Sequence, residues 1–303
     1  MDSDRDKLDA LATEGVRADL DDLDLRSVAD VVRLLVDGQD AALAAVHRAV
    51  PQLAEAAEQI AARLAEGGRL FYVGAGTSGR LAVLDAAECV PTFNTPPDMV
   101  VALLAGGEAA FIEAVEGAED DAAAGAADLD AHGLSSRDAV VGIAASGRTP
   151  YAVGALHHAS ELGAYTVAIA NNPGSTLAAA AEHAVELLTG PEVIAGSTRL
   201  GAGTAQKIAL NTLSTAVMVK LGKTYGSRMI DVRATNAKLK RRALRIVCDI
   251  TSAGEAQAVQ ALETAGGSVK TAVVMLLSRC DAATAEQRLQ HAGGRVRDAV
   301  AAD

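Results

Sequence analysis

The residues best suited to bind an anion lie in the glycine-rich segment Gly74-Ala75-Gly76-Thr77-Ser78-Gly79-Arg80, directly after the apolar run 70–73. A strand followed by a glycine turn and a helix exposes backbone N–H groups at the helix N-terminus, where the helix dipole favours negative charge. Thr77 and Ser78 add two hydroxyl donors at the same place. We therefore predict that Gly76, Thr77 and Ser78 hold a phosphate group.

The same segment also fits Gly-x-Gly-x-x-Gly, the pattern of dinucleotide-binding folds. A dinucleotide site needs an acidic residue at the end of the second strand, about 20 residues further on, to hold the ribose. Here the next apolar run, 99–104, ends in Ala105-Gly106-Gly107, and Asp98 lies before it. A terminal phosphate is therefore favoured over a dinucleotide.

Two further turns combine hydroxyls with a cation. Since Ser and Thr cap helices routinely, each turn alone indicates little, but three such turns in one α/β unit favour a phosphate pocket. Arg148 and Arg199 rank above Arg80 among the cations because they share turns with hydroxyls. The residues predicted to complete the pocket are Ser146, Gly147, Arg148, Thr149, Ser197, Thr198, Arg199 and Lys207.

The elements that must position these turns alternate between strand and helix. Short apolar runs occupy 70–73, 99–104, 139–144 and 165–170, with a weaker one at 184–188, and helix-like segments separate them. This alternation predicts an α/β fold with a doubly wound, mostly parallel sheet flanked by helices. Ligands bind at the carboxyl ends of strands in such sheets, so the turns that follow three of these runs, 74–79, 146–150 and 171–175, are expected to share one cleft.

The chain is predicted to have three parts: an N-terminal helical arm over 1–55, a phosphate-binding α/β domain over 56–222 and a small helical region over 223–303. In the arm, a helix is expected from Val28 to Leu43, with its start at 21–24. A helix over 203–221 and another over 235–247 follow the sheet, the second with a basic cluster typical of a solvated face. Residues 252–303 indicate three small helices.

Composition excludes several classes of function. Hydrophobic residues make up 50% of the 303 residues but aromatic residues only 2%, which predicts a core of small side chains. A net charge of −12 argues against a nucleic-acid or anionic-membrane surface. Three cysteines without framework spacing indicate a reducing compartment. Since neither a signal-peptide core nor an apolar membrane span is evident, we expect a cytoplasmic protein without nucleic-acid or membrane partners.

Over nearly its whole length the sequence resembles the N-acetylmuramic acid 6-phosphate etherase family of the sugar isomerase (SIS) superfamily. The blocks that carry the resemblance are 72–81, 84–89, 114–120, 142–151, 190–193 and 203–207 with Asn211. The resemblance implies a lyase that cleaves the lactyl ether of this phosphorylated amino sugar to N-acetylglucosamine 6-phosphate and D-lactate, with no metal or organic cofactor. It also implies two functional glutamates, Glu88 and Glu119. Val90 stands where the family usually has proline, which alters local stiffness beside Glu88.

That chemistry explains the need for carboxylates. Eliminating lactate from carbon 3 requires a proton to leave carbon 2, which is acidic only once the ring opens and carbon 1 is an aldehyde. The leaving oxygen then needs a proton, and water adds to the unsaturated aldehyde. We predict that Glu88, flanked by apolar residues, is the principal acid/base and protonates the leaving group. Glu119 is the second acid/base or positions water, with Glu116 as an alternative on the same helix face.

Distance along the helix then predicts a shared site. If the helix from Ser78 to Glu88 is continuous, a rise of about 1.5 Å per residue puts Glu88 about 15 Å from the phosphate segment. This separation is long compared with the size of a hexose phosphate substrate. We therefore expect a homodimer in which Glu88 completes the cleft of the neighbouring subunit.

Two other functions stay open. An SIS-type sugar-phosphate isomerase also opens the ring and moves the carbon 2 proton, but it leaves the lactyl ether intact. A non-catalytic sugar-phosphate-sensing regulator is disfavoured by the presence of both Glu88 and Glu119 and by the lack of a basic DNA-binding domain.

Overall fold

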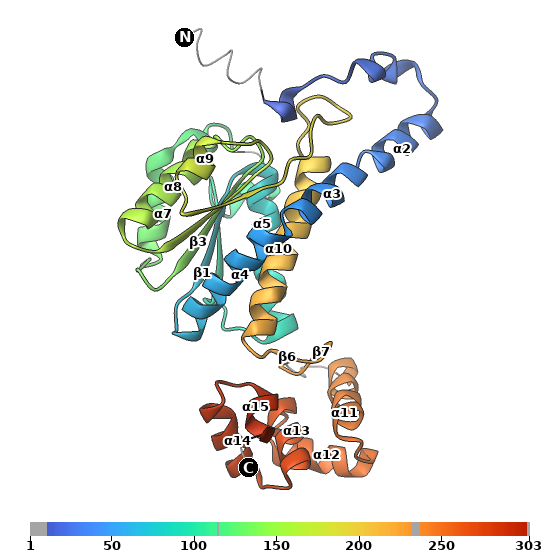
Figure 1. Cartoon of the computed structure of the whole chain (residues 1–303), viewed down its shortest axis with the longest axis vertical. Helices are drawn as coiled ribbons and strands as arrows, with labels where there is room; N and C mark the ends of the chain where they lie inside the picture. The colour runs from blue at the N-terminus through green and yellow to red at the C-terminus, as the bar shows by residue number, and fades with distance from the viewer. Residues whose placement is uncertain (1–10, 114, 232–236, 302–303) are drawn as a thin grey trace. The chain divides into compact units, whose positions relative to one another are not determined.

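The computed structural model describes residues 11–113, 115–231 and 237–301 (Figure 1). The described chain forms two compact units. The first contains the chain up to Ala86 together with 98–214, and the second contains 87–97 together with the chain from Thr215 onward. Two long helices, α5 (Gly76–Phe93) and α10 (Gly201–Lys220), each begin in the first unit and continue into the second.

The first unit is built on a five-stranded parallel sheet. Its strands are β1 (Leu70–Gly74), β2 (Val100–Leu104), β3 (Ala139–Ala144), β4 (Tyr165–Ala170) and β5 (His183–Glu186). They follow the order β2-β1-β3-β4-β5, and every neighbouring pair is parallel. The predicted doubly wound α/β sheet is confirmed. The weakest predicted strand, 184–188, is displaced by one or two residues.

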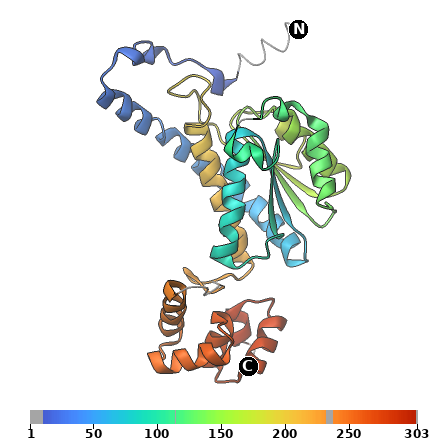
Figure 2. The ribbon, with the colours of Figure 1, turned by 180° about the vertical axis from the view of Figure 1, so that it is seen from behind.

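Helices cover both faces of this sheet (Figures 1 and 2). On one face lie α4 (Val50–Ala65) and the first-unit parts of α5 and α10, and on the other lie α7 (Ala122–Ala131), α8 (Pro150–Glu161) and α9 (Thr176–Ala179). Glycines let α7 and α8 touch, because a Cβ atom at Gly125 would lie 2.1 Å from the Tyr151 carbonyl oxygen, and one at Gly154 would lie 2.2 Å from that of Ala122. Small side chains therefore permit close packing, as the composition predicted.

The N-terminal arm differs from the expected single helix. Three short 3-10 turns, η1 (Ala12–Glu14), η2 (Ala18–Leu20) and η3 (Leu23–Leu25), precede α2 (Val28–Asp37) and α3 (Asp40–Arg48). The expected start at 21–24 was wrong, because Ser27 caps α2 by accepting a hydrogen bond from the Asp30 N–H at 3.2 Å. The helix breaks at Gly38, where a Cβ atom would lie 2.8 Å from Val193 Cγ2.

The second unit contains a short hairpin and a cluster of helices. The hairpin pairs β6 (Thr224–Tyr225) with β7 (Arg228–Met229), and the helices are α11 (Ala237–Thr251), α12 (Glu255–Thr264), α13 (Val269–Ser278), α14 (Ala282–His291) and α15 (Val296–Ala301). The prediction of three helices after 252 was wrong: the chain breaks at Gly266-Gly267 and Gly293-Gly294 as expected, but a further break at Arg279, whose φ is +51°, separates α13 from α14. The expected start of α11 at Thr235 lies outside the described residues.

Within the described ranges, none of the helices has the length and apolar character that crossing a membrane requires.

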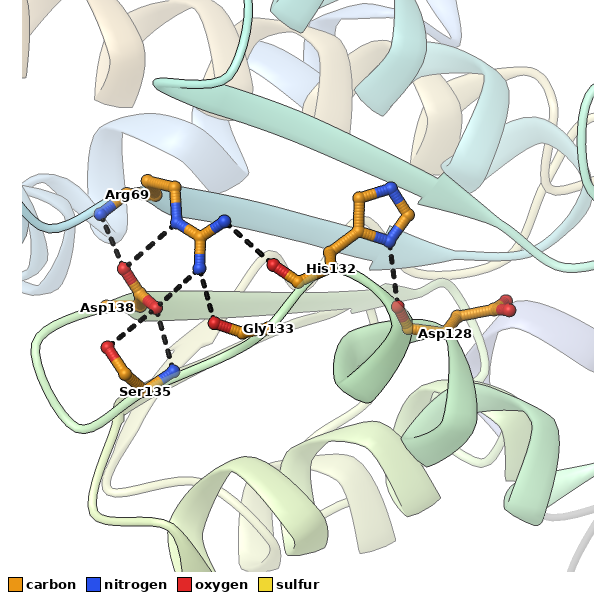
Figure 3. Close-up of polar contacts among 6 residues, drawn as sticks. All are labelled: Arg69, Asp128, His132, Gly133, Ser135 and Asp138. Carbon is orange, nitrogen blue, oxygen red and sulfur yellow. Dashed lines mark hydrogen bonds and ion pairs between the residues drawn. The ribbon is translucent and has the colours of Figure 1, made fainter.

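A buried ion pair joins β1 to β3 at the amino-terminal edge of the sheet (Figure 3). Asp138, whose side chain is only 2% exposed, pairs with Arg69 Nη2 at 3.1 Å and accepts hydrogen bonds from the Arg69 N–H and from Ser135. The Arg69 guanidinium also donates to the carbonyls of His132 and Gly133, at 2.8 and 2.7 Å. Burial disfavours the charged carboxyl, but these hydrogen bonds outweigh it and hold the pKa of Asp138 below its usual range.

A carboxyl whose pKa is lower in the folded state stabilises the protein above its unfolded pKa of about 3.9, and the contribution is lost as pH falls through the folded value. Asp138→Asn is therefore expected to lower the free energy of unfolding by about 1.5–3 kcal/mol at pH 7. Urea unfolding at pH 7 and below pH 4 measures this difference, which should shrink in acid. An equal difference at both pH values would contradict the assignment.

Candidate functional site

The glycine-rich segment places the start of α5 directly against the carboxyl edge of the sheet. Gly76 has a φ of +52°, a left-handed conformation that glycine adopts without strain. A Cβ atom at Gly79 would lie 2.6 Å from the Gly74 carbonyl oxygen and 2.4 Å from Leu104 Cδ1. Only glycine fits there, and the first-turn N–H groups, which lack intrahelical acceptors, therefore lie at the ends of β1 and β2.

The strand order makes this edge a ligand crevice. The chain passes from β1 outward to β2 on one side, and from β3 through β4 to β5 on the other. Ligands in open α/β sheets bind outside the carboxyl ends of strands where the order reverses in this way. Segment 74–80 follows β1 and segment 145–149 follows the adjacent β3, so the topology brings two of the predicted turns to one crevice.

The second turn, at 145–149, is fixed by its backbone. Ser146 Oγ accepts a hydrogen bond from the Arg148 N–H at 3.2 Å. Gly147 has a φ of +68°, and a Cβ atom there would lie 2.3 Å from the Ser175 Cβ. Arg148 and Thr149 are half-buried. The turn therefore places the Ser146 hydroxyl and the Arg148 guanidinium beside segment 74–80, and its backbone requires a glycine at position 147.

The third turn, at 197–199, is linked through α10 to the glycine-rich segment 74–80. We call this segment, which the sequence predicts to hold a phosphate, the phosphate loop. A Cβ atom at Gly203 would lie 3.4 Å from Thr77 Cγ2, so the first turn of α10 borders the loop. Ser197 and Thr198 are half-buried just before this helix, whereas Arg199 and Lys207 are exposed. The predicted turns thus gather on one edge, while these two cations face solvent in the single chain.

The buried carboxylate of Glu192 occupies the N-terminus of α10. It accepts hydrogen bonds from the N–H groups of Gly201 and Ala202 at 2.9 and 2.8 Å. A carboxylate at this position is stabilised by the helix dipole. These two N–H groups are therefore already bonded, and the free helix terminus at the crevice belongs to α5. Glu192 lies in the block 190–193 that carries the family resemblance, but the sequence alone did not indicate that it caps α10.

A chain of buried hydrogen bonds fixes the Ser78 side chain. Ser78 Oγ donates to Gln206 Oε1 at 2.8 Å, Gln206 Nε2 donates to Asn171 Oδ1 at 2.9 Å, and Asn171 Nδ2 donates to the Leu187 carbonyl at 2.9 Å. Since a carbonyl only accepts, the direction of the whole chain is set. Ser78 thus joins the loop to α10 and to the turn after β4. Asn171 lies in the turn 171–175 that was expected at the cleft, and Gln206 lies in the block 203–207, but the sequence assigned neither of them a contact with Ser78.

The second catalytic candidate lies beside the loop. A cavity of about 250 Å³ has among its lining residues Gly76, Arg80, Glu116 and Glu119. Glu119 belongs to the short turn η4 (Ala118–Asp120), and Glu116 precedes it in a separate turn containing Gly117 with a φ of +74°. The prediction that these two glutamates share a helix face was therefore wrong, because the left-handed glycine separates them. The cavity nevertheless brings both carboxylates to the phosphate loop.

Glu88 is placed differently. The helix α5 runs unbroken through Glu88, so a rise of about 1.5 Å per residue separates it from Ser78 by about 15 Å along the axis. Its side chain is exposed, and the neighbouring Val90 is 38% exposed. The apolar enclosure predicted from its flanking residues is therefore not provided within one chain.

Three residues before Glu88, a buried carboxylate fixes the middle of α5. Asp85, 4% exposed, accepts hydrogen bonds from the Tyr72 hydroxyl at 3.0 Å, Asn211 Nδ2 at 2.6 Å and the Ser214 hydroxyl at 3.1 Å. These donors come from β1 and α10. The contacts fix the rotation of α5 about its axis, and sequence analysis had not singled out Asp85 for any role.

Matches to protein families and to solved structures identify the class of protein to which this chain belongs. Residues 122–216 match the SIS domain family, and residues 52–160 match the glucokinase regulatory protein N-terminal SIS domain. The structure of a phosphoheptose isomerase from Francisella tularensis has a TM-score of 0.50 at 20% identity, covering 64% of this chain and 98% of that chain. The fold is therefore that of an SIS domain.

Relatives that match this chain over almost its full length identify its family within the SIS class. The N-acetylmuramic acid 6-phosphate etherase of Streptomyces coelicolor is 52% identical over 98% of this chain and 96% of its own. The etherase of Deinococcus radiodurans is 55% identical over 88% of each chain, and that of Mycolicibacterium smegmatis is 53% identical over 91% of this chain and 92% of its own. The chain belongs to the N-acetylmuramic acid 6-phosphate etherase family.

Gln206→Met tests the hydrogen-bond chain. The substitution keeps a side chain of similar size but leaves the buried Asn171 oxygen without its donor, so we expect the free energy of unfolding to fall by about 1–3 kcal/mol. Urea unfolding measures the change, with Thr215→Met at an exposed position of the same helix as the control. Equal stability of the two variants would contradict a stabilising role for the hydrogen bond between Gln206 and Asn171.

Proposed function

We propose that this protein is a lyase that cleaves the D-lactyl ether of N-acetylmuramic acid 6-phosphate, giving N-acetylglucosamine 6-phosphate and D-lactate. The observation that carries the proposal is the cavity in which the glycine-rich phosphate loop meets Glu119. High identity to etherases over almost the full chain supports the same reaction. A phosphorylated substrate and three cysteines without a disulfide fit a cytoplasmic site of action.

We assign the substrate phosphate to the α5 N-terminus. Backbone N–H groups at 76–78 and the Thr77 hydroxyl supply donors, and the helix dipole adds positive potential. Residues 76–78 carry no formal charge, so in a protein of net charge −12 these donors and the helix dipole supply the local attraction for the anion. The residues assigned to complete the pocket are Ser78, Ser146, Gly147, Arg148, Thr149, Ser197, Thr198, Arg199 and Lys207.

The two carboxylates divide the proton transfers. With the phosphate fixed and the ring open, a base removes the carbon 2 proton and an acid protonates the lactate oxygen as its bond to carbon 3 breaks. Water then adds at carbon 3, and the proton returns to carbon 2. We assign Glu88 to protonation of the leaving group, and Glu119 as the second acid/base or the group that positions water.

Turnover in deuterated water tests both the reaction and the assignment. We expect D-lactate release with deuterium at carbon 2 of the product, and a fall in kcat of at least about 100-fold in Glu88→Gln and in Glu119→Gln, since general acid–base groups contribute that much. Asp120→Asn, an exposed neighbour in η4, is the matched control. An intact lactyl ether after turnover would favour an isomerase, and undiminished lactate release from Glu88→Gln would overturn its catalytic role.

We also propose a homodimer with shared sites. The distance of Glu88 from the loop along α5 favours its use in the crevice of a second copy. An apolar stripe is available for such contact: Val28, Val32 and Val36 repeat every four residues on α2 and are 80%, 53% and 63% exposed, and no residue of this helix is buried. Stripes of this kind are typical of helices that pack against a partner.

Mixed dimers test the sharing. Subunits carrying Glu88→Ala are combined with subunits carrying Ser78→Asp, whose added charge repels the phosphate, and heterodimers are isolated through two affinity tags. In a two-fold dimer with shared sites, one of the two sites is fully intact, so about half of the wild-type activity should return. Inactive heterodimers would show that each subunit uses its own Glu88.

A further inference from the structure

Arg80 binds the end of a short helix beside the cavity. Its Nε atom lies 3.1 Å from the carbonyl oxygens of both Ala110 and Phe111, and its Nη2 lies 3.3 Å from that of Glu113. Ala110 and Phe111 are the two middle residues of the four-residue helix α6 (Ala109–Ile112), and Glu113 is the residue that follows it. The guanidinium thus donates to three main-chain oxygens.

This contact stabilises a segment that has little stability of its own. A four-residue helix such as α6 is too short to persist alone, and its terminal carbonyls lack intrahelical donors. A cation at a helix C-terminus satisfies them and complements the dipole, and the planar guanidinium reaches several acceptors at once. Val115 adds a second anchor at Gly106, whose φ is +85° and where a Cβ atom would lie 2.9 Å from the Val115 Cβ.

Both ends of the connection belong to the candidate site. Arg80 lies on α5, the helix whose first turn forms the phosphate loop, and the segment it binds leads into Glu116 and Glu119. Arg80 lines the same cavity as these two carboxylates. One side chain therefore links the element that holds the phosphate to the element that carries a proposed acid/base.

We propose that Arg80 is a positioning residue that sets Glu119 relative to the phosphate loop, and that it is not a phosphate ligand. This inference rests on the proposed function. The Arg80 guanidinium donates to several carbonyl oxygens at once, a contact that we call the Arg80 clamp. The clamp depends on the planar arrangement of the guanidinium donors and not on positive charge alone.

Kinetics separate this role from phosphate binding. Because a displacement of about 1 Å at a catalytic group costs on the order of 100-fold, we expect Arg80→Met and Arg80→Lys each to lower kcat about 10- to 100-fold, with KM within about threefold of wild type. A phosphate ligand would instead raise KM, and lysine would restore much of the binding. A rise in KM at unchanged kcat would overturn the proposal.

A double-mutant cycle asks whether Arg80 acts through Glu119. The pair Arg80→Met/Glu119→Gln should be no slower than Glu119→Gln alone, since the group being positioned is already lost. Full additivity of the two effects would overturn the proposal. Arg69→Met is the matched control, because Arg69 also donates to carbonyls at a helix end but at the opposite edge of the sheet. It should lower stability without changing kcat.

A measurement independent of turnover distinguishes failure of this inference from failure of the proposed function. In Arg80→Met, amide hydrogen exchange should rise at least about tenfold over 109–113 and 115–119, while exchange over 70–74 stays at the wild-type rate. Unchanged exchange in the first two stretches would overturn the clamp whatever reaction the protein catalyses. If exchange rises but wild-type protein releases no lactate, the clamp stands and the lyase assignment fails.

Discussion

The position of every element at the site depends on one close contact, in which Gly79 of α5 packs against Gly74, the last residue of β1. Because a Cβ atom at Gly79 would lie 2.6 Å from the Gly74 carbonyl oxygen and 2.4 Å from Leu104 Cδ1, only glycine lets α5 start at the sheet edge with its first-turn N–H groups at the crevice. Any side chain at this position would push the helix outward. The phosphate loop, the Ser78 hydrogen bond and the Arg80 clamp all originate in the first turns of that helix.

A polar stripe then fixes how α5 is rotated. Ser78 and Asp85 lie seven residues apart on one helix face, both buried, and both bond to side chains of α10. Buried polar groups of this kind stabilise a structure only when every member is satisfied, so they specify one arrangement of the two helices with β1. Glu88 lies off this stripe and is exposed. The same constraint that fixes the start of α5 therefore leaves this carboxylate exposed in the single chain, as the proposed sharing of Glu88 between subunits requires.

The strands and their turns could be predicted because their signals are local. The apolar runs at 139–144 and 165–170 coincide with β3 and β4, and the hydroxyl turns follow from glycine and serine chemistry. Partners distant in sequence could not be predicted: Ser78 and Gln206 are 128 residues apart, and nothing near either residue indicates the other. The close approach of Val193 to Gly38 is another such contact, and the separation of Glu116 from Glu119 follows from the left-handed backbone of Gly117. Hydrophobic periodicity indicates neither of them.

The amino end of α5 is the proposed binding site for the phosphate of the substrate. A crystal structure with N-acetylglucosamine 6-phosphate, the proposed product, would locate that phosphate. We expect its oxygens within hydrogen-bond distance of the N–H groups of 76–78 and of the Thr77 hydroxyl, with the sugar extending toward Glu119. A phosphate bound elsewhere, with this loop in contact only with water, would contradict it.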